Sequence, residues 1–109
     1  MRGPQMADRA IALKASERDN VATIFADGIV AGTEVEVLDP TGARTLMTVV
    51  DDVPYGHKLA LCDIALGAQI TKYGEEIGMA SQDIRRGAYV HVHNLDSMRG
   101  RGDLEREGE

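Results

Sequence analysis

The sequence contains no tryptophan, three tyrosines, one phenylalanine and a single cysteine, Cys62. With so few aromatic rings, a hydrophobic core has to be built mainly from Val, Ile, Leu, Ala and Met. A single cysteine excludes an internal disulfide, and one thiolate cannot by itself hold an iron–sulfur cluster. Cys62 lies between Leu61 and Asp63 in an apolar context, so we expect a buried and unreactive thiol.

The sequence also lacks a surplus of positive charge and any long apolar run. It has 12 Lys plus Arg residues against 18 Asp plus Glu, a formal net charge of −6 at pH 7. Because a nucleic-acid contact surface needs clustered Lys and Arg, we expect no nucleic-acid partner. No apolar run approaches the roughly 20 residues that span a bilayer. The N-terminus has no apolar central region of a secretory signal. These absences predict a cytoplasmic protein with no membrane contact.

The composition fits one small globular domain, since 43% of the 109 residues are hydrophobic and 28% are charged. Gly3 and Pro4 lie in a polar start, and residues 1–9 are expected to form a flexible N-terminus. The folded domain is expected at residues 10–95. Residues 96–109 contain an Arg-Gly-Arg-Gly-Asp run and an acidic end, which predict a flexible or partner-binding tail.

Short apolar segments separated by turn residues predict β-strands. Thr33–Leu38 alternates between polar and apolar residues, and the turn sequence Asp39–Gly42 leads into a partner strand at Ala43–Val50. Further strands are expected at residues 9–15, 21–25 and 59–61. No 10-residue amphipathic helix is evident, although Ala60–Leu66 is long enough for one helical turn. The sequence therefore predicts an all-β domain with at most one or two short helical turns.

A short internal repeat runs through the chain. Asp63–Ile70 and Asp83–Val90 both follow the pattern D-I-x-x-G-A-x-(I/V), and Asp27–Val35 is a looser third copy with one inserted glycine. In each copy, the Asp is expected to start a turn and the Gly to supply a left-handed residue before a strand. The glycines of Lys72–Gly78 likewise indicate a tight turn with positive φ. We interpret the repeat as a folding motif with no chemical role.

All three histidines of the chain fall in two short segments. His57 lies in Gly56–Lys58, and the other two, His91 and His93, lie in Tyr89–Asn94. Histidine is the side chain whose ordinary pKa lies nearest to neutral pH, and it is a common metal ligand. These two segments are therefore the candidate functional residues of the sequence.

The segment Tyr89–Asn94 alternates between polar and apolar residues, which is typical of a strand. In a strand, Val90 and Val92 would face a core, while Tyr89, His91 and His93 would share the other face. Two imidazoles at i and i+2 can reach one ligand, which favours a metal site or an acid–base pair. The same spacing also describes two surface histidines on the polar face of an edge strand.

Three motifs taken together resemble a known family. Gly56–Leu61 reads GHKLAL, Lys72–Gly78 reads KYGEEIG and Val90–Asn94 reads VHVHN. In combination with the repeat, they resemble the SAF domain of the altronate/galactarate dehydratase family over roughly residues 10–94. The resemblance implies a β-clip fold, a compact and bent arrangement of short strands. In that family the domain is either fused to a large catalytic domain or forms a separate small subunit, as in the related sulfolactate sulfo-lyase.

The resemblance implies that this chain is the small SAF subunit of a hydroxy-acid dehydratase, a carbon–oxygen lyase of sugar-acid catabolism. It would act with a separate large catalytic subunit, because the length of the chain fits the separate form. The implied substrate is a sugar acid or another hydroxy acid, and the sulfo-lyase branch eliminates sulfite in place of water. The implied cofactor is a divalent metal, with Fe²⁺ expected first and Mn²⁺ or Mg²⁺ as alternatives. Whether the chain is an active enzyme by itself is left open.

Dehydration of a hydroxy acid needs a base, a group that stabilises the enediolate, and an acid that helps the hydroxyl leave. On the residues that carry the resemblance, His91 and His93 are the first candidates for metal ligands, together with His57. His57, Lys58 and Asn94 are the catalytic candidates, with Lys58 pairing with the substrate carboxylate and Asn94 orienting a hydroxyl or a ligand histidine. The alternatives are a solvated surface lysine at Lys58 and a simple strand end at Asn94.

A different class of function fits the same fold. SAF-like domains also serve as non-catalytic modules that bind carbohydrate or mediate protein interactions. The discriminating feature is the histidine set, for which such a module has no need. Exposed strand edges in so small a β domain also favour self-association or a partner, so a homo-oligomer remains a further expectation.

Overall fold

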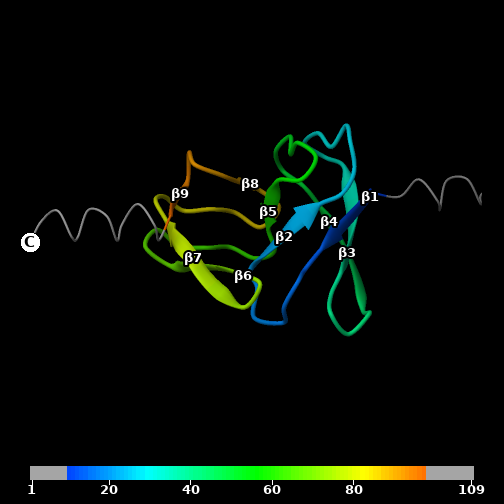
Figure 1. Cartoon of the computed structure of the whole chain (residues 1–109). Coiled ribbons are helices and arrows are strands. Elements are labelled where there is room, and N and C mark those ends of the chain that lie inside the picture. Colours follow the sequence, from blue (N-terminus) through cyan, green and yellow to red (C-terminus); the bar gives the residue numbers. More distant parts are fainter. Residues whose placement is uncertain (1–9, 98–109) are drawn as a thin grey trace, which may run out of the picture.

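A computed structural model describes residues 10–97, which form nine β-strands and no helix (Figure 1). The prediction of an all-β fold is therefore confirmed. Most of the predicted terminal segments lies outside the described residues, although Asp96 and Ser97 form the end of the last strand. Within 10–97 there is no helix long and apolar enough to cross a membrane. The strands are β1 Ala10–Leu13, β2 Val21–Ile24, β3 Glu34–Leu38, β4 Arg44–Thr48, β5 Lys58–Ala60, β6 Gln69–Lys72, β7 Glu75–Ala80, β8 Tyr89–Val90 and β9 Leu95–Ser97.

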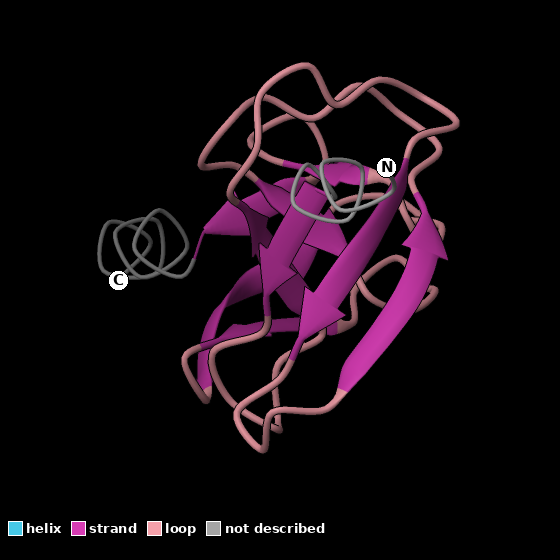
Figure 2. Ribbon diagram, turned by 90° about the vertical axis from the view of Figure 1, so that its right-hand side faces the viewer, coloured by secondary structure: helices cyan, strands magenta, loops and turns pink. Residues whose placement is uncertain are grey.

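The strands form two sheets. Six strands are hydrogen-bonded in the order β4-β3-β1-β2-β5-β8, and three more in the order β6-β7-β9. Only β1 and β3 pair in parallel, and all the other described strand pairs are antiparallel. Figure 2 shows the strands curving around a shared interior, with loops gathered at two ends. Short, bent strands of this kind agree with the expected β-clip architecture.

The predicted hairpin at residues 33–50 is confirmed as β3 and β4. The two strands pair from Glu34 opposite Thr48 to Leu38 opposite Arg44. Their turn is held by the carboxylate of Asp39, whose Oδ1 accepts hydrogen bonds from backbone N–H groups at 2.9 and 3.0 Å and from the Thr41 hydroxyl at 2.7 Å. These three hydrogen bonds explain why the turn sequence could be recognised without any long-range information.

The expected tight turn is confirmed at Gly74, between β6 and β7, whereas Gly78 lies within β7 and has no positive φ. Tyr73 has a φ of 57° and Gly74 a φ of 75°, which is the primed turn that suits a two-residue hairpin. A positive φ is uncommon for a tyrosine. The buried carboxylate of Asp19 holds both residues in place by accepting hydrogen bonds from Tyr73 N at 3.0 Å and Gly74 N at 2.8 Å.

The internal repeat corresponds to a recurring turn in the structure. Two isolated β-bridges, Ile29–Val53 and Ile64–Ile84, each join two copies of the motif in antiparallel fashion. Every bridging residue is followed three residues later by a glycine with positive φ. In each copy, the residue after that glycine donates its backbone N–H to the carbonyl oxygen of the residue two positions before the glycine. This hydrogen bond, with a positive φ at the glycine, is typical of a type II turn. These glycines are Gly32, Gly56, Gly67 and Gly87.

The structure adds two facts that sequence reading missed. First, the aspartates do not start their own turns. Asp63 Oδ1 accepts a hydrogen bond from Arg86 N at 2.8 Å, and Asp83 Oδ1 accepts one from Leu66 N at 2.9 Å, so each Asp stabilises the turn of the opposite copy. Second, Asp52–Leu59 is a fourth copy of the motif, and it contains the Gly-His-Lys sequence.

Two hydrophobic cores lie on opposite faces of β5. Leu59 is fully buried in one core and the next residue, Ala60, is fully buried in the other, because successive side chains of a strand point to opposite faces. The first core also contains Ile24, and the second contains Ile70. Strand β5 thereby places its first residue, Lys58, and the preceding residue, His57, next to the junction of the two cores.

Two expectations for residues 60–66 are wrong. No helical turn forms there, because the chain bends after β5 and both backbone groups of Ile64 are then hydrogen-bonded to Ile84 at 2.7 Å. Cys62 is exposed, since it lies in the loop after β5, outside both cores. The apolar neighbours that suggested burial belong to the strand before the loop.

A pair of matched glycine variants tests this architecture. Gly67 and Gly87 hold the same place in the repeat, with φ of 85° and 89°. A Cβ at Gly67 would meet nothing within 4 Å, whereas one at Gly87 would lie 2.6 Å from Thr48 O. We expect Gly67→Ala to lower the free energy of unfolding by about 1–2 kcal/mol, through backbone strain alone. Gly87→Ala should cost about 1–3 kcal/mol more, because the backbone of β4 must also move.

Urea denaturation of both variants against the wild-type chain measures the difference. Equal losses of stability in the two variants would contradict the close approach between Gly87 and the end of β4.

Candidate functional site

The pairing of β5 with β8 brings the two histidine segments together. In this antiparallel pair, Lys58 lies opposite Val90 and Leu59 lies opposite Tyr89. The two strands lie next to one another in Figure 1, with β8 at the edge of the six-stranded sheet. His57 immediately precedes β5, and His91 immediately follows β8. The site therefore forms where one strand begins and its neighbour ends.

The three histidines surround Tyr89, and we call these four residues the imidazole cluster. The hydroxyl of Tyr89 lies 3.0 Å from His57 Nδ1. The Tyr89 ring stacks nearly parallel to the His91 ring, with 5.7 Å between centroids, and lies 5.3 Å from the His93 ring. The rings of His57 and His91 meet edge to face at 4.9 Å. Tyr89 is thus the central member of the cluster.

Sequence reasoning did not include Tyr89 among the site residues, although the signal was present. The alternating pattern placed Tyr89 on the same face as His91 and His93. The contact with His57 was not visible in the pattern, because it depends on the pairing of two strands that are 32 residues apart along the chain.

The expected strand over residues 89–94 is wrong beyond Val90. Residues 92–94 form a turn, and Val92 is 76% exposed instead of facing a core. The strand cannot continue because Asn94 binds the backbone that a neighbouring strand would need. Its Oδ1 accepts a hydrogen bond from His91 N at 2.9 Å, and its Nδ2 donates one to Tyr89 O at 2.9 Å. The Asn94 N–H also donates to His91 O at 3.0 Å.

Asn94 therefore has a clear structural place in the site. Its side chain is buried, and both ends of its amide are bound to the backbone of the cluster. Through these bonds it sets the turn that carries His91 and His93 back against the Tyr89 ring. This geometry makes Asn94 a positioning residue for the histidines.

Lys58 provides a positive charge beside the cluster. It is half-buried, and burial lowers its pKa, with a smaller contribution from the positive charge of Lys72. Among residues 10–97, no carboxylate lies within ion-pair distance of the Lys58 ammonium. In a chain with a net charge of −6, an unpaired and partly desolvated ammonium is a suitable place to bind an anion.

The electrostatic surroundings also act on His91. Partial burial lowers its pKa, and so do the nearby groups His57, Lys58 and His93. All of these effects oppose the charged imidazolium. They favour the neutral imidazole, which is the form that accepts a proton or binds a metal.

The part of the chain from 10 to 97 contains no group of three or more His, Cys, Asp or Glu side chains arranged to hold a metal ion. Asp51 and Asp52 both bind the backbone, since Asp51 Oδ2 accepts a hydrogen bond from Tyr89 N at 3.0 Å and Asp52 Oδ1 accepts one from Ala31 N at 3.0 Å. The assignment of His57, His91 and His93 as metal ligands stays a prediction. A metal centre here would need further ligands from outside the described residues.

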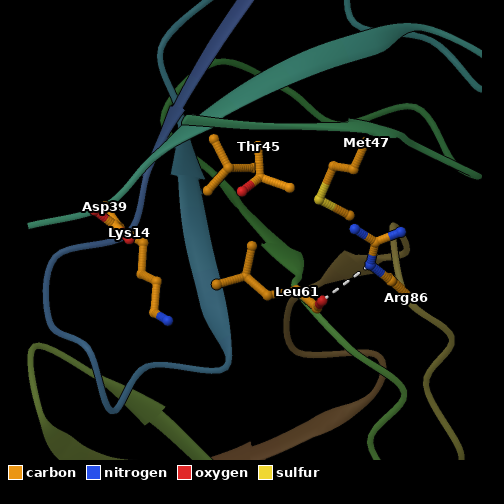
Figure 3. A pocket seen from close by; sticks show the side chains of 7 residues that line it. Lys14, Asp39, Thr45, Met47, Leu61 and Arg86 are labelled. Atoms are coloured by element: carbon orange, nitrogen blue, oxygen red, sulfur yellow. Dashed lines mark hydrogen bonds between the residues drawn. The ribbon is translucent and has the colours of Figure 1, made fainter. Parts of the chain in front are cut away.

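Two surface hollows help to place the site. One, of about 370 Å³, is lined by His93 and Asn94 together with Arg85 and Asp51, so open space adjoins the cluster. The other, of about 150 Å³, lies between Lys14 and Arg86 (Figure 3) and contains no histidine. The Arg86 side chain at its rim donates a hydrogen bond to the carbonyl oxygen of Leu61 at 3.2 Å. The imidazole cluster, with its adjoining hollow, is therefore the better candidate for chemistry.

Comparison with known proteins gives a consistent result. Residues 10–98 match the family described as the altronate/galactarate dehydratase SAF domain. The chain is 48% identical over 82 residues to altronate dehydratase of Escherichia coli (strain K12), an overlap of 75% of this chain and 15% of that protein. It is 38% identical over 87 residues to galactarate dehydratase (L-threo-forming) of the same organism, covering 79% of this chain and 15% of that protein.

A third relative has a similar length. The chain is 39% identical over 82 residues to (2R)-sulfolactate sulfo-lyase subunit alpha of Chromohalobacter salexigens, covering 74% of this chain and 87% of that subunit. The chain thus spans only about 15% of these two Escherichia coli dehydratases, but most of the sulfo-lyase subunit.

A titration of His91 tests the electrostatics of the site. We expect its pKa, measured from the imidazole C2 proton by NMR, to lie below the ordinary value of 6.5. Lys58→Met keeps an aliphatic side chain but removes a positive charge, so it should raise the pKa of His91. Because the folded state favours the neutral form of His91, its favourable contribution to the free energy of unfolding is complete above about pH 6.5. That contribution is lost as the pH falls through the lowered pKa. Lys14→Met, at the other hollow, is the matched control and should leave the pKa of His91 unchanged.

The role of Asn94 is tested by stability. Asn94→Ala removes two buried side-chain hydrogen bonds and should lower the free energy of unfolding by about 2 kcal/mol, measured by urea denaturation. Gln82→Ala, at an exposed position in the same hollow, should change it by no more than about 0.5 kcal/mol. An Asn94→Ala chain as stable as the wild type would show that other contacts hold the turn.

Proposed function

This chain belongs to the altronate/galactarate dehydratase SAF domain family, and we propose that it is the small subunit of a hydroxy-acid lyase. In this proposal it works in the cytoplasm with a separate large catalytic subunit and takes part in the breakdown of a sugar acid or related hydroxy acid. The observation that carries the proposal is the 87% coverage of a sulfo-lyase subunit alpha, against 15% of the dehydratases. The matched region corresponds to a separate small subunit in one branch of the family and to a short part of a longer chain in the other.

The chemistry of the cluster suits an anionic substrate. The Lys58 ammonium is free to pair with a substrate carboxylate, and that pairing offsets the burial that lowers its pKa. Elimination of water or sulfite from the position next to the acidic carbon builds negative charge on the carboxylate oxygens. His57 and His91 lie within one small cluster and can donate hydrogen bonds to those oxygens or exchange protons with the substrate. Asn94 acts indirectly, by holding the turn.

A divalent metal is part of this proposal. His91 and His93 are the first candidate ligands and His57 the third, with the remaining ligands supplied by the large subunit. Imidazole nitrogen suits Fe²⁺ better than it suits Mn²⁺ or Mg²⁺, which favour oxygen ligands. When bound, such an ion supplies a Lewis acid that stabilises negative charge on the substrate. Because no group of three or more such side chains within residues 10–97 is arranged to hold an ion, the proposal requires ligands from the large subunit.

Metal content in the assembled enzyme tests the proposal. The chain is co-expressed with its candidate large subunit, purified without oxygen and assayed for metal by mass spectrometry and for elimination from a panel of hydroxy acids that includes sulfolactate. Metal should be found only in the complex and should be lost, together with activity, in the His91→Ala/His93→Ala double variant. Val92→Ala alters an exposed residue in the same turn and should retain both.

The opposite result has a definite meaning. A double variant that keeps full metal content and activity would support the non-catalytic binding module, with the histidines as surface residues. The lack of any stable complex would count against the two-subunit arrangement.

A further inference from the structure

The two ring nitrogens of His57 have different surroundings. Nδ1 is 3.0 Å from the hydroxyl of Tyr89, whereas Nε2 makes no hydrogen bond within residues 10–97. Only Nε2 is therefore free to meet a substrate or a metal. Which chemistry it offers depends on which nitrogen carries the proton of the neutral ring.

Tyr89 is held in place through its backbone and its ring. Its backbone N–H donates a hydrogen bond to Asp51, and its carbonyl oxygen accepts one from the buried Asn94. Its ring is half-buried against the first core and is stacked on His91. Tyr89 is therefore fixed by groups that are independent of His57, and it is able to impose an orientation on the imidazole.

The direction of the hydrogen bond follows from the needs of both groups. In the part of the chain that the structure describes, His57 Nδ1 is the sole acceptor within reach of the Tyr89 hydroxyl. A phenol is a good donor, and an unprotonated imidazole nitrogen is a good acceptor. If Nδ1 carried the proton, the phenol hydrogen would have no partner in the domain. Donation from Tyr89 to Nδ1 satisfies both groups and leaves the proton of His57 on Nε2.

We propose that Tyr89 is a positioning residue that holds His57 in the Nε2-protonated form, which makes His57 a hydrogen-bond donor to the substrate. A neutral imidazole with its proton on the outward nitrogen stabilises negative charge on an oxygen atom, and it does not bind a metal through that nitrogen. Of the two candidate roles of His57, metal ligand and catalytic group, the proposal keeps only the catalytic one. Metal binding is then left to His91 and His93. The role of His57 as a donor to the substrate rests on the proposed lyase function. The position of the proton on the His57 ring does not depend on that function.

Long-range ¹H–¹⁵N NMR spectra of the full chain, recorded above the pH at which the histidines titrate, test the protonation directly. The wild-type spectrum should show His57 with a protonated Nε2 and an unprotonated Nδ1. Tyr89→Phe keeps the stacked ring but removes the donor, so the Nδ1 signal should shift to the position of a nitrogen without a hydrogen bond. Tyr73→Phe makes the same chemical change at a tyrosine that is 70% exposed, and should leave the signals of His57 unchanged.

The wild-type spectrum alone can overturn the proposal, whatever the variants do. A proton on Nδ1 and a bare Nε2 would mean that Tyr89 accepts the hydrogen bond and that His57 presents a lone pair. An Nδ1 signal that does not move in Tyr89→Phe would mean that the Tyr89 hydroxyl makes no hydrogen bond to the His57 ring in solution.

The assembled enzyme gives a second and separate readout. Tyr89→Phe should lower kcat about 10-fold, as expected for loss of a group that orients a site histidine. It should have no further effect when His57 is already replaced by Ala, and His57→Ala should keep its metal. Loss of metal in His57→Ala would identify His57 as a ligand and overturn the donor role. If no complex shows lyase activity, the proposed function fails, while the NMR result still decides the protonation of His57.

Discussion

The candidate site depends on the antiparallel contact between β5 and the chain around β8. Ala60 donates a hydrogen bond to Ala88 O at 2.9 Å and accepts one from Gly87 N at 2.8 Å, which fixes the register of the two strands. On its other side, Gly87 lies against the backbone at the end of β4, where a Cβ would be 2.6 Å from Thr48 O. A shift of one residue would turn Tyr89 away from His57 and place Lys58 in a core. A change that weakens this contact is therefore expected to disturb the geometry of the imidazole cluster as well.

The repeated turn explains how a short chain combines a regular frame with a specific site. Each copy has a bridging apolar residue, a glycine with positive φ and a strand that leads into a core. The residues directly after the glycine are not required by the turn and differ between copies. In one copy they are His57 and Lys58, and in another they are Ala88 and Tyr89. His57, Lys58 and Tyr89 therefore lie at positions that vary between copies of the repeat, whereas the other two histidines follow the last copy.

Electrostatics distinguish this region from the rest of an acidic chain. Lys58 and the three histidines form a group of cationic and titratable side chains, while the carboxylate of Asp51 is bound to the backbone of Tyr89. Partial burial and mutual repulsion favour the neutral form of His91, and an anion that paired with Lys58 would offset part of that repulsion. This combination is consistent with an acidic substrate, and with a partner that completes the site from the side of the open hollow.

The sequence by itself determined the all-β class, the hairpin of β3 and β4, and the tight turns with their glycines. These features depend on residues that are neighbours in the chain: Asp39 binds its own turn, and a glycine allows positive φ wherever it occurs. The sequence also brought attention to the segments of the three histidines. Only the tertiary structure decided that Val92 and Cys62 are exposed and that Tyr89 lies at the centre of the site. The physical reason is that alternating residues suit a strand or a turn equally well, and only the hydrogen-bond partners supplied by distant parts of the chain select between them.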